Sequence, residues 1–258
     1  MIDIKTPEQI KKMQIGGKIL SDVVWAVCKA AKPGVSELEI DALAEKLILE
    51  AGGKPGFKLV EGYHHTICAC TNDVVVHGIP SHYKLQEGDV FDIDCGVFYE
   101  GFHTDMCETV RIGNKSKEQR AKNNDEVDEF LATGKYALQE AIKQALGGNR
   151  VGHISQTIQR IVEGKGYSVV RSLIGHGVGK ELHEDPEVPG YLDMPLMKTP
   201  LLKPGMTIAI EVIYNMGKLG VVYSGEDDWK IKTKDGSLSA VFERSVAITE
   251  GDPIILTP

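Results

Sequence analysis

Three acidic residues lie inside stretches of sequence that otherwise have the pattern of buried strands. Asp94, Glu211 and Glu243 are each flanked by apolar and β-branched residues. An acid in that setting must be paired, protonated or bound to a metal, because an isolated buried carboxylate costs many kcal/mol. Any one of them could instead occupy the solvated face of a half-buried strand. Three such placements in one chain favour a shared site.

Three histidines and a fourth acid extend this set. His176 lies among three glycines, whose missing side chains would let the backbone approach a ligand closely. His183 follows seven residues later, and His77 ends an apolar strand at a turn, where functional groups often project into a cleft. Asp105 lies eleven residues after Asp94. That separation predicts a hairpin with both carboxylates on one face.

These residues predict a site for divalent metal ions. The donor set is rich in oxygen and poor in imidazole, which suits Mn, Fe or Co and also admits Zn, and it lacks the thiolates of a structural zinc site. Two ions about 3.5–4 Å apart would generate hydroxide at neutral pH and hold a tetrahedral intermediate. The predicted chemistry is hydrolysis of an amide or a phosphoester. The candidate ligands are Asp94, Asp105, Glu211, Glu243 and one or both of His176 and His183.

Helices and strands follow one another in an order that would position these residues. Capping signals and apolar periodicity predict helices that begin at Thr6, at Ser36, near Ser116 (continuing to about Leu146) and at His153 (continuing to Gly164). The predicted strands are Val74–Val76, Val90–Ile93, Tyr167–Leu173, Thr207–Tyr214, Val221–Tyr223 and Val241–Ile248. The order helix, helix, strands therefore occurs in both halves. We expect an α+β fold with an internal structural pseudo-repeat, in a single domain over residues 1–258.

The composition is that of a globular protein and excludes several classes. Of 258 residues, 42% are hydrophobic and 26% charged, so extensive disorder is excluded. The formal net charge of −8 argues against a nucleic-acid-binding surface, and no apolar run approaches the ~18–20 residues of a membrane span. The N-terminus has no secretory signal pattern, and the five cysteines form neither a disulfide framework nor a zinc ribbon. We expect a cytoplasmic protein.

Six short motifs follow one another along the chain. They are Asn72–Pro80, Gly88–Asp94, Gly101–Asp105, Gly175–Gly179 with His183–Pro186, Ile210–Glu211, and Lys232–Glu243. Each motif is weak alone, but the ordered series is specific, and through it the chain resembles type I methionine aminopeptidases, a group of M24 metallopeptidases, over essentially its whole length. The resemblance implies the pita-bread fold, in which two pseudo-two-fold halves form a curved antiparallel sheet covered by helices.

The resemblance implies a dinuclear centre with two divalent ions, which would be Co, Mn, Fe or Zn. Asp94 would chelate one ion, and Asp105 and Glu243 would bridge the pair. His176 and Glu211 would complete the ligands of the second ion. All five residues that the family pattern requires are present in this chain.

The resemblance also implies roles in the reaction. A hydroxide that bridges the metals would attack the scissile carbonyl, while Glu211 serves as acid and base. His77 and His183 would contact the substrate and stabilise the developing oxyanion. Asp92 points to the same strand face as Asp94, and the resemblance, not the periodicity, selects Asp94 as the ligand.

A pocket lined by aromatic rings and sulfur is the implied binding site for a methionine side chain. Tyr63, Cys68 and Trp229 occupy the matching positions, and sulfur–aromatic contacts suit a thioether. The implied reaction removes the N-terminal methionine from nascent polypeptides with a small second residue. The implied partners are these nascent chains and, transiently, the ribosome. We expect a monomer with no nucleic-acid specificity and no membrane association.

Four residues depart from the usual pattern of these enzymes. Arg244 and Ser245 replace a His-Thr pair, Val212 replaces a proline, and Leu182 stands where relatives often have an aromatic residue. No ligand atom is lost, so the departures concern the surroundings of the metals and the shape of the pocket. For Arg244 two outcomes are open: it lowers metal affinity, or it pairs with a nearby acid.

Two other functions share this pattern. X-Pro aminopeptidases and dipeptidases use the same five ligands, but they typically carry an extra N-terminal domain, whereas about sixty residues precede the first motif here. A non-catalytic binding protein on this fold would have lost its ligands, and all five are present here. Methionine aminopeptidase activity is therefore the expected function.

Overall fold

Two capped helices begin the chain, as their start signals predict. In α1 (Pro7–Ala30) and α2 (Glu37–Glu50), the N-cap hydroxyl of Thr6 or Ser36 accepts from a backbone N–H of the first turn. The side chain of the same first-turn residue reaches back to the N-cap N–H and completes a capping box.

The structure is a computed structural model, which describes residues 2–113, 125–224 and 229–258.

The first half of the chain builds an antiparallel sheet against these helices. β4 (Val90–Tyr99) pairs with β5 (Phe102–Arg111) along one edge. Along its other edge, β4 pairs with β1 (Lys54–Pro55) and β2 (Ile67–Thr71). Alternate residues of this sheet face α1 and α2 and form an apolar core. The residues between them along each strand face the opposite side, where the candidate site lies.

The second half repeats this arrangement with other helices. α4 (Glu126–Ile142) and α5 (Val151–Gly164) cover a sheet whose longest pair is β9 (Thr207–Asn215) and β12 (Ser239–Ala247). A second apolar core lies between these helices and this sheet. The shorter strands of the sheet are β6 (Ser168–Val169), β7 (Gly175–Gly177), β8 (Glu184–Val188) and β13 (Ile254–Ile255).

A small third sheet joins the two halves at one end. β3 (Val74–Val76) from the first half pairs with β11 (Ile231–Thr233), which pairs with β10 (Val221–Tyr223). Buried aliphatic side chains from β3, β9, β11 and β12 pack together beneath it. Single-turn 3₁₀ helices are seen at η1 (Phe57–Leu59) and η2 (Leu196–Lys198).

Several predicted elements differ in extent from those observed. The strand predicted over Val90–Ile93 continues to Tyr99, and the helix predicted from His153 begins at Val151. The helix expected from Ser116 to Leu146 is seen as α4, and its expected first residues, 116–124, lie outside the described residues. The strand expected over Tyr167–Leu173 pairs only at β6, and the N–H of Val170 makes one more bond, to the carbonyl of Ile213 at 3.0 Å. Beyond that bond the chain leaves the edge of β9.

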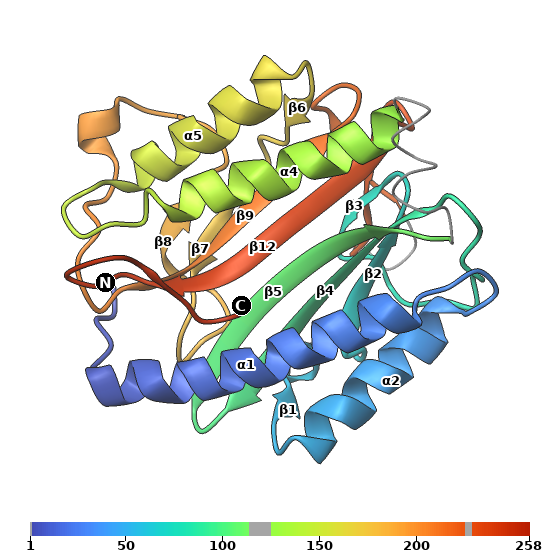
Figure 1. The fold of residues 1–258 in the computed structure, drawn as a ribbon, viewed down its shortest axis with the longest axis horizontal. Coiled ribbons are helices and arrows are strands. Elements are labelled where there is room, and N and C mark those ends of the chain that lie inside the picture. The colour runs from blue at the N-terminus through green and yellow to red at the C-terminus, as the bar shows by residue number, and fades with distance from the viewer. Residues whose placement is uncertain (1, 114–124, 225–228) are drawn as a thin grey trace.

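The two halves meet where β5 and β12 lie side by side across the middle of the molecule (Figure 1). Helices α1, α2, α4 and α5 lie on one side of the two sheets, and the long strands of both halves converge beneath them. Side chains that point away from the helices on β4, β5, β9 and β12 therefore share one space. This arrangement brings the carboxylates of both halves to one site.

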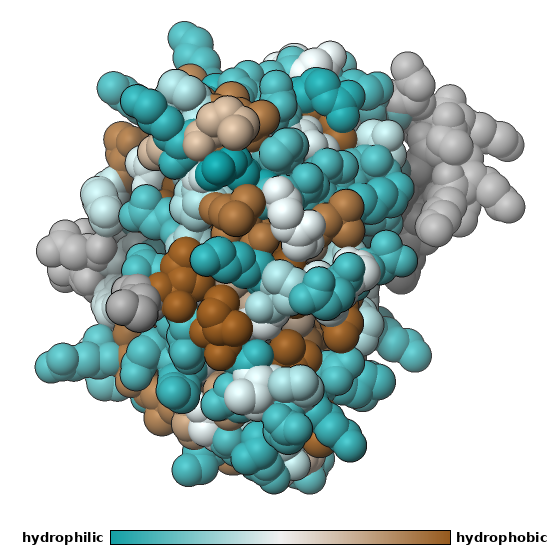
Figure 2. All heavy atoms as spheres, turned by 90° about the vertical axis from the view of Figure 1, so that its left-hand side faces the viewer, coloured by the Kyte–Doolittle hydropathy of each residue, from teal (hydrophilic) through white to brown (hydrophobic). Residues whose placement is uncertain are grey.

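One end of the molecule carries apolar side chains in small groups. Figure 2 shows the face at the left of Figure 1, where these groups are separated by hydrophilic side chains. The short helix η2 lies at this end and exposes Met197.

Candidate metal centre and substrate pocket

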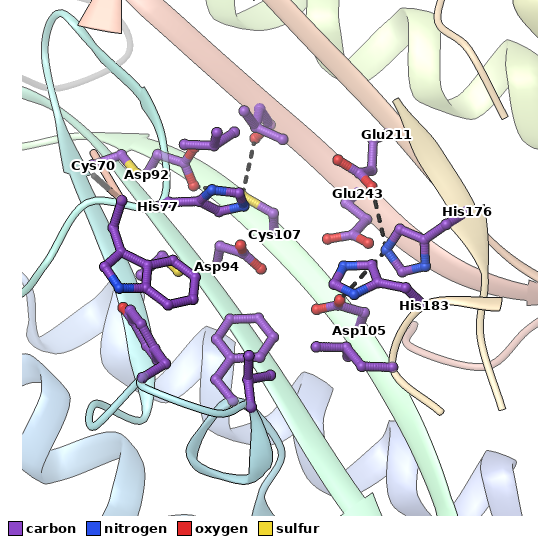
Figure 3. Close-up of a pocket in the computed structure, with 18 residues that line it drawn as sticks. Cys70, His77, Asp92, Asp94, Asp105, Cys107, His176, His183, Glu211 and Glu243 are labelled. Atoms are coloured by element: carbon purple, nitrogen blue, oxygen red, sulfur yellow. Dashed lines mark hydrogen bonds and ion pairs between the residues drawn. The ribbon is translucent and has the colours of Figure 1, made fainter. Parts of the chain in front are cut away.

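Strand register brings four carboxylates of the two halves together. In the β4–β5 hairpin, Asp105 stands opposite Gly96, two residues along the same face from Asp94. The predicted hairpin with both acids on one face is therefore confirmed. In the second half, the β9–β12 register places Glu211 directly opposite Glu243. Figure 3 shows Asp94, Asp105, Glu211 and Glu243 converging on one space between the sheets.

One histidine joins this cluster from a third strand. β7 pairs with β9 so that His176 stands opposite Ala209, and its Nε2 lies 3.5 Å from Glu211 Oε1 and 3.9 Å from Asp105 Oδ2. One ligand atom each from Asp105, His176 and Glu243 lies within 4.8 Å of the others. His176 Nδ1 lies 2.8 Å from the carbonyl of Gly177, which leaves Nε2 facing the carboxylates. This geometry suits an imidazole that donates at Nδ1 and binds a cation at Nε2.

The charges of this cluster favour a cation. Burial raises the pKa of Asp94 to about 7, and burial and then the neighbouring carboxylates raise the pKa values of Asp105 and Glu243 well above the usual range. Burial lowers the pKa of His176 to about 4. Within the described residues, the buried atoms Asp94 Oδ1 and Glu243 Oε1 have no hydrogen-bond partner. Orphaned carboxylate oxygens that face a neutral imidazole fit divalent metal ions.

The glycines around His176 let β7 lie close to its neighbouring strands. A Cβ at Gly177 would lie 2.2 Å from the carbonyl oxygen of Asp185, and one at Gly175 would lie 2.5 Å from that of Ala209. β7 lies between β8 and β9. At the positions before and after His176, only glycine leaves room for the backbone of these neighbouring strands. The expected close approach of backbone is present, but its partners are the neighbouring strands.

A strained turn directs a second histidine into the pocket. His77 follows β3 with φ +55°, a left-handed conformation that side chains rarely adopt. The next residue, Gly78, approaches β2 so closely that a Cβ there would lie 2.0 Å from the carbonyl oxygen of Ala69. The strain at His77 therefore belongs to a turn that aims its ring at the carboxylate cluster (Figure 3). Burial, and then the charge of His183, lowers the pKa of His77.

His183 lies on the other side of the cluster. Its ring centroid is 4.4 Å from that of His176. Burial lowers the pKa of His183. Within the described residues, His77 and His183 do not belong to the group of close ligand atoms from Asp105, His176 and Glu243. Both line the same pocket, which has a volume of about 700 Å³ including space open to solvent.

An apolar arm of this pocket begins beside Asp94. Tyr63 and Trp229 meet edge to face with ring centroids 5.3 Å apart, and the Tyr63 hydroxyl donates to the carbonyl of Ile67 at 2.7 Å. Cys68 stands opposite Asp94 across β2 and β4, so its thiol lines the arm next to the carboxylates. All three predicted pocket residues therefore lie together. Sequence reasoning missed the further wall residues Phe57 and Val60, which carry no motif of their own.

Asp92 occupies the opposite end of the pocket from His176 (Figure 3). It faces the same side of β4 as Asp94, as the periodicity predicts, and it is buried. Its Oδ1 accepts a hydrogen bond from the Cys107 thiol, and the pocket lining includes both side chains. Within the described residues, Asp92 does not belong to the group of ligand atoms within 4.8 Å of one another.

Arg244 pairs with an acid on the far side of the sheet. It follows Glu243 on β12 and so points to the helix side, where its Nη2 lies 2.9 Å from Glu108 Oε2. Its Nη1 donates to the carbonyls of Glu243 at 2.7 Å and Cys107 at 3.2 Å. Lys135 on α4 also contacts Glu108, at 2.7 Å. Of the two outcomes left open by the sequence, the structure has the ion pair.

The comparisons with known proteins agree with this geometry. Residues 11–250 match metallopeptidase family M24. The chain belongs to this family. It is 42% identical over 258 residues to the methionine aminopeptidase of Clostridium acetobutylicum, covering 100% of this chain and 99% of that protein. Its structure matches that of a methionine aminopeptidase from Thermotoga maritima with a TM-score of 0.91 at 37% identity, covering 100% of this chain and 99% of the other.

Other M24 structures show how far the likeness extends. A prolidase from Pyrococcus furiosus matches with a TM-score of 0.74 at 24% identity, and this chain covers 65% of it. That likeness concerns the fold alone. Together these matches confirm the expected pita-bread fold. Among the helices that the structure describes, none has the length and apolar character needed to cross a bilayer.

Proposed function

We propose that this M24 chain is a methionine aminopeptidase that removes the N-terminal methionine from nascent polypeptides with a small second residue. The observation that carries the proposal is the apolar arm formed by Tyr63, Cys68 and Trp229, which opens directly beside the carboxylate–histidine cluster. An unbranched thioether fits such an arm, because sulfur makes favourable contacts with aromatic edges. The relatives that share 37–42% identity over nearly all of their length carry the same name.

The five predicted ligands suit a pair of divalent ions from the series Co, Mn, Fe and Zn. Asp94, Asp105, Glu211 and Glu243 offer eight carboxylate oxygens between them, and His176 offers one imidazole nitrogen. Such ions supply Lewis acidity toward a carbonyl oxygen and toward water at neutral pH. The donor atoms come from both halves of the fold, so the substrate carbonyl would be held where the two halves meet.

The chain's own side chains supply the remaining chemistry. Glu211 lies in the middle of β9 beside His176, where its carboxyl can take a proton from water and pass it to the leaving amine. His77 and His183 approach from opposite walls of the pocket and can donate to the carbonyl oxygen as negative charge develops there. The rings that enclose the methionine side chain exclude water from this region and fix the distance between the scissile bond and Glu211.

The proposal extends to the setting of the reaction. We infer that the chain acts as one catalytic domain over residues 1–258, as a cytoplasmic monomer. Its partners are nascent chains that begin with methionine, met during transient association with the ribosome. The formal net charge of −8 speaks against a stable hold on ribosomal RNA.

Peptide hydrolysis tests the proposal directly. Metal-free protein is titrated with Mn, Fe, Co or Zn and assayed on Met-Gly-Met-Met and on Ala-Pro-Gly. Cleavage of the methionyl peptide alone is expected. Asp94→Asn is the matched control, since it keeps the size of a ligand and removes its charge. Cleavage of the prolyl peptide instead would assign the chain to the prolidase branch, and metal binding without cleavage of either peptide would refute the proposal.

A further inference from the structure

The two halves meet at a seam that lacks the usual strand ladder. β5 pairs with β4 on one side and β12 pairs with β9, and in the described part of the chain no ladder joins β5 to β12. Their facing edges nevertheless carry backbone N–H and C=O groups that need partners once they are buried. Side chains supply those partners at the seam.

A serine hydroxyl bonds to both backbone groups of Asp105, one of the predicted metal ligands. We call such a pair of bonds, from one hydroxyl to the N–H and C=O of one residue, a clamp. Ser245 on β12 is fully buried, and its Oγ accepts from the N–H of Asp105 at 2.9 Å and donates to the carbonyl of the same residue at 2.8 Å. One side chain thus takes the place of the two ladder bonds that a neighbouring strand would make to Asp105. The Asp105 carboxylate projects from that backbone into the cluster with Glu243 and His176.

A threonine makes the same clamp in the opposite direction. Thr109 on β5 is fully buried, and its Oγ1 accepts from the N–H of Val241 at 2.9 Å and donates to the carbonyl of Val241 at 2.7 Å. Thr109 lies four residues after Asp105, and Ser245 lies four residues after Val241. The two clamps are therefore related by the pseudo-two-fold symmetry of the fold, but only one of them holds a residue with a ligand side chain.

The C-terminal segment fixes the serine itself. The N–H of Ser245 donates to Thr257 Oγ1 at 3.0 Å, and the carbonyl of Ser245 accepts from the N–H of Leu256 at 2.8 Å. Both backbone groups of Ser245 are thus bonded to the C-terminal segment. These bonds hold the backbone from which the hydroxyl reaches Asp105.

We propose that Ser245 is a positioning residue of the metal centre, which sets the place of Asp105 relative to Glu243 before any metal binds. The two carboxylates belong to different halves, so their separation depends on how β5 and β12 are held at this point. Without the hydroxyl, the Asp105 backbone would relax toward another partner, and metal binding would have to restore its place. This inference rests on the metal-dependent function proposed above.

Metal affinity of matched variants tests the inference. Ser245→Ala and Thr109→Val each remove one clamp hydroxyl and little else, and Ser245→Thr and Thr109→Ser keep it. Isothermal titration of the metal-free proteins with Mn²⁺ gives dissociation constants, and thermal unfolding in EDTA gives the loss of stability. Both hydroxyl deletions should lower the unfolding temperature, because each takes a partner from two buried backbone groups, although the carbonyl of Val241 keeps the Cys107 thiol at 3.5 Å.

Only the serine deletion should change the metal centre. We expect Ser245→Ala to weaken Mn²⁺ binding at least tenfold, which corresponds to about 1.4 kcal/mol. Thr109→Val should stay within threefold of the wild type, and Ser245→Thr should restore the affinity. If Ser245→Ala does not fold, Thr257→Val, which frees the Ser245 N–H and leaves the seam intact, should weaken binding at least threefold.

Two results would overturn the inference. Equal losses of affinity in Ser245→Ala and Thr109→Val would mean that the seam acts only through general stability, and unchanged affinity in Ser245→Ala would mean that Asp105 is placed by other contacts. Neither result touches the proposed function, which fails only if the wild-type chain with bound metal does not cleave the methionyl peptide.

Discussion

The buried ion pair of Arg244 and Glu108 tests how the helix side of the seam contributes to stability. The two side chains are 12% and 3% exposed. Arg244→Met keeps much of the apolar stem of the side chain and removes every donor. Glu108 would then keep only Lys135, whose own side chain is 46% exposed. The carbonyls of Cys107 and Glu243 would lose a donor as well.

We expect Arg244→Met to lower the free energy of unfolding by about 2–4 kcal/mol. Removing one partner of a buried ion pair costs ~3–5 kcal/mol, because the other charge is left uncompensated. The remaining contact between Lys135 and Glu108 reduces that loss. The double variant Arg244→Met with Glu108→Met should recover most of it, since replacing both members of a buried pair with apolar groups is often neutral.

Urea unfolding of the metal-free protein measures these changes, and Mn²⁺ titration of the same variants measures the metal centre. Arg244 points to the helices, so the affinity of Arg244→Met for Mn²⁺ should stay within threefold of the wild type. The reasoning is refuted if Arg244→Met unfolds like the wild type but binds Mn²⁺ more tightly. That result would show that the guanidinium acts on the metals through its charge and not through Glu108.

Four further outcomes are expected. Glu243→Ala should bind less than one metal ion per chain by elemental analysis and should lose peptidase activity. His77→Ala should keep its metals and lose about 10²–10³-fold in kcat, the usual cost of removing one oxyanion donor; loss of metal from this variant would identify a ligand instead. Lys5 is buried and pairs with Glu184, which follows the pocket residue His183 in the sequence. Lys5→Met removes this ion pair and should displace His183, so in steady-state kinetics kcat should fall by a larger factor than KM rises. In EDTA, the wild type should lose about 1.4 kcal/mol more stability from pH 6 to pH 8 than Asp94→Asn does in urea titrations. Burial raises the pKa of Asp94 to about 7, so the stability that its protonated form contributes is lost as pH rises through that value; equal pH profiles of the two proteins would contradict this.

Local signals predicted the helices well, because their causes lie within a few residues. The capping boxes at Thr6 and Ser36 each depend on one side chain and a backbone group three residues away. The extent of strands was less accessible to sequence. The stretch Tyr167–Leu173 has a strand pattern throughout, but only β6 and one further bond pair with β9. Where a strand leaves a sheet depends on its distant neighbour.

The candidate site likewise has one part that the sequence predicted and one part that it could not. Residue type and order brought out Asp94, Asp105, Glu211, Glu243 and His176, and the structure brings them together, although their roles as ligands stay predictions. The clamps at the seam could not be found from sequence. Ser245 and Asp105 are 140 residues apart, and Thr109 and Val241 are 132 apart. A buried serine or threonine on a strand gives no local sign of which distant backbone it will meet.

The seam links metal binding to the stability of the whole fold. Two of the predicted ligands come from the first half of the chain and three from the second, so a bound ion would join the halves where the backbone ladder is missing. Any ligand that binds only the folded state stabilises it, by about 2.7 kcal/mol at a concentration one hundred times its dissociation constant. The clamps of Ser245 and Thr109 hold the halves in register before the metal arrives, and the metal then offsets the mutual repulsion of the carboxylates that they bring together. A centre built this way gains affinity from the rigidity of the seam, and the seam gains stability from the metal.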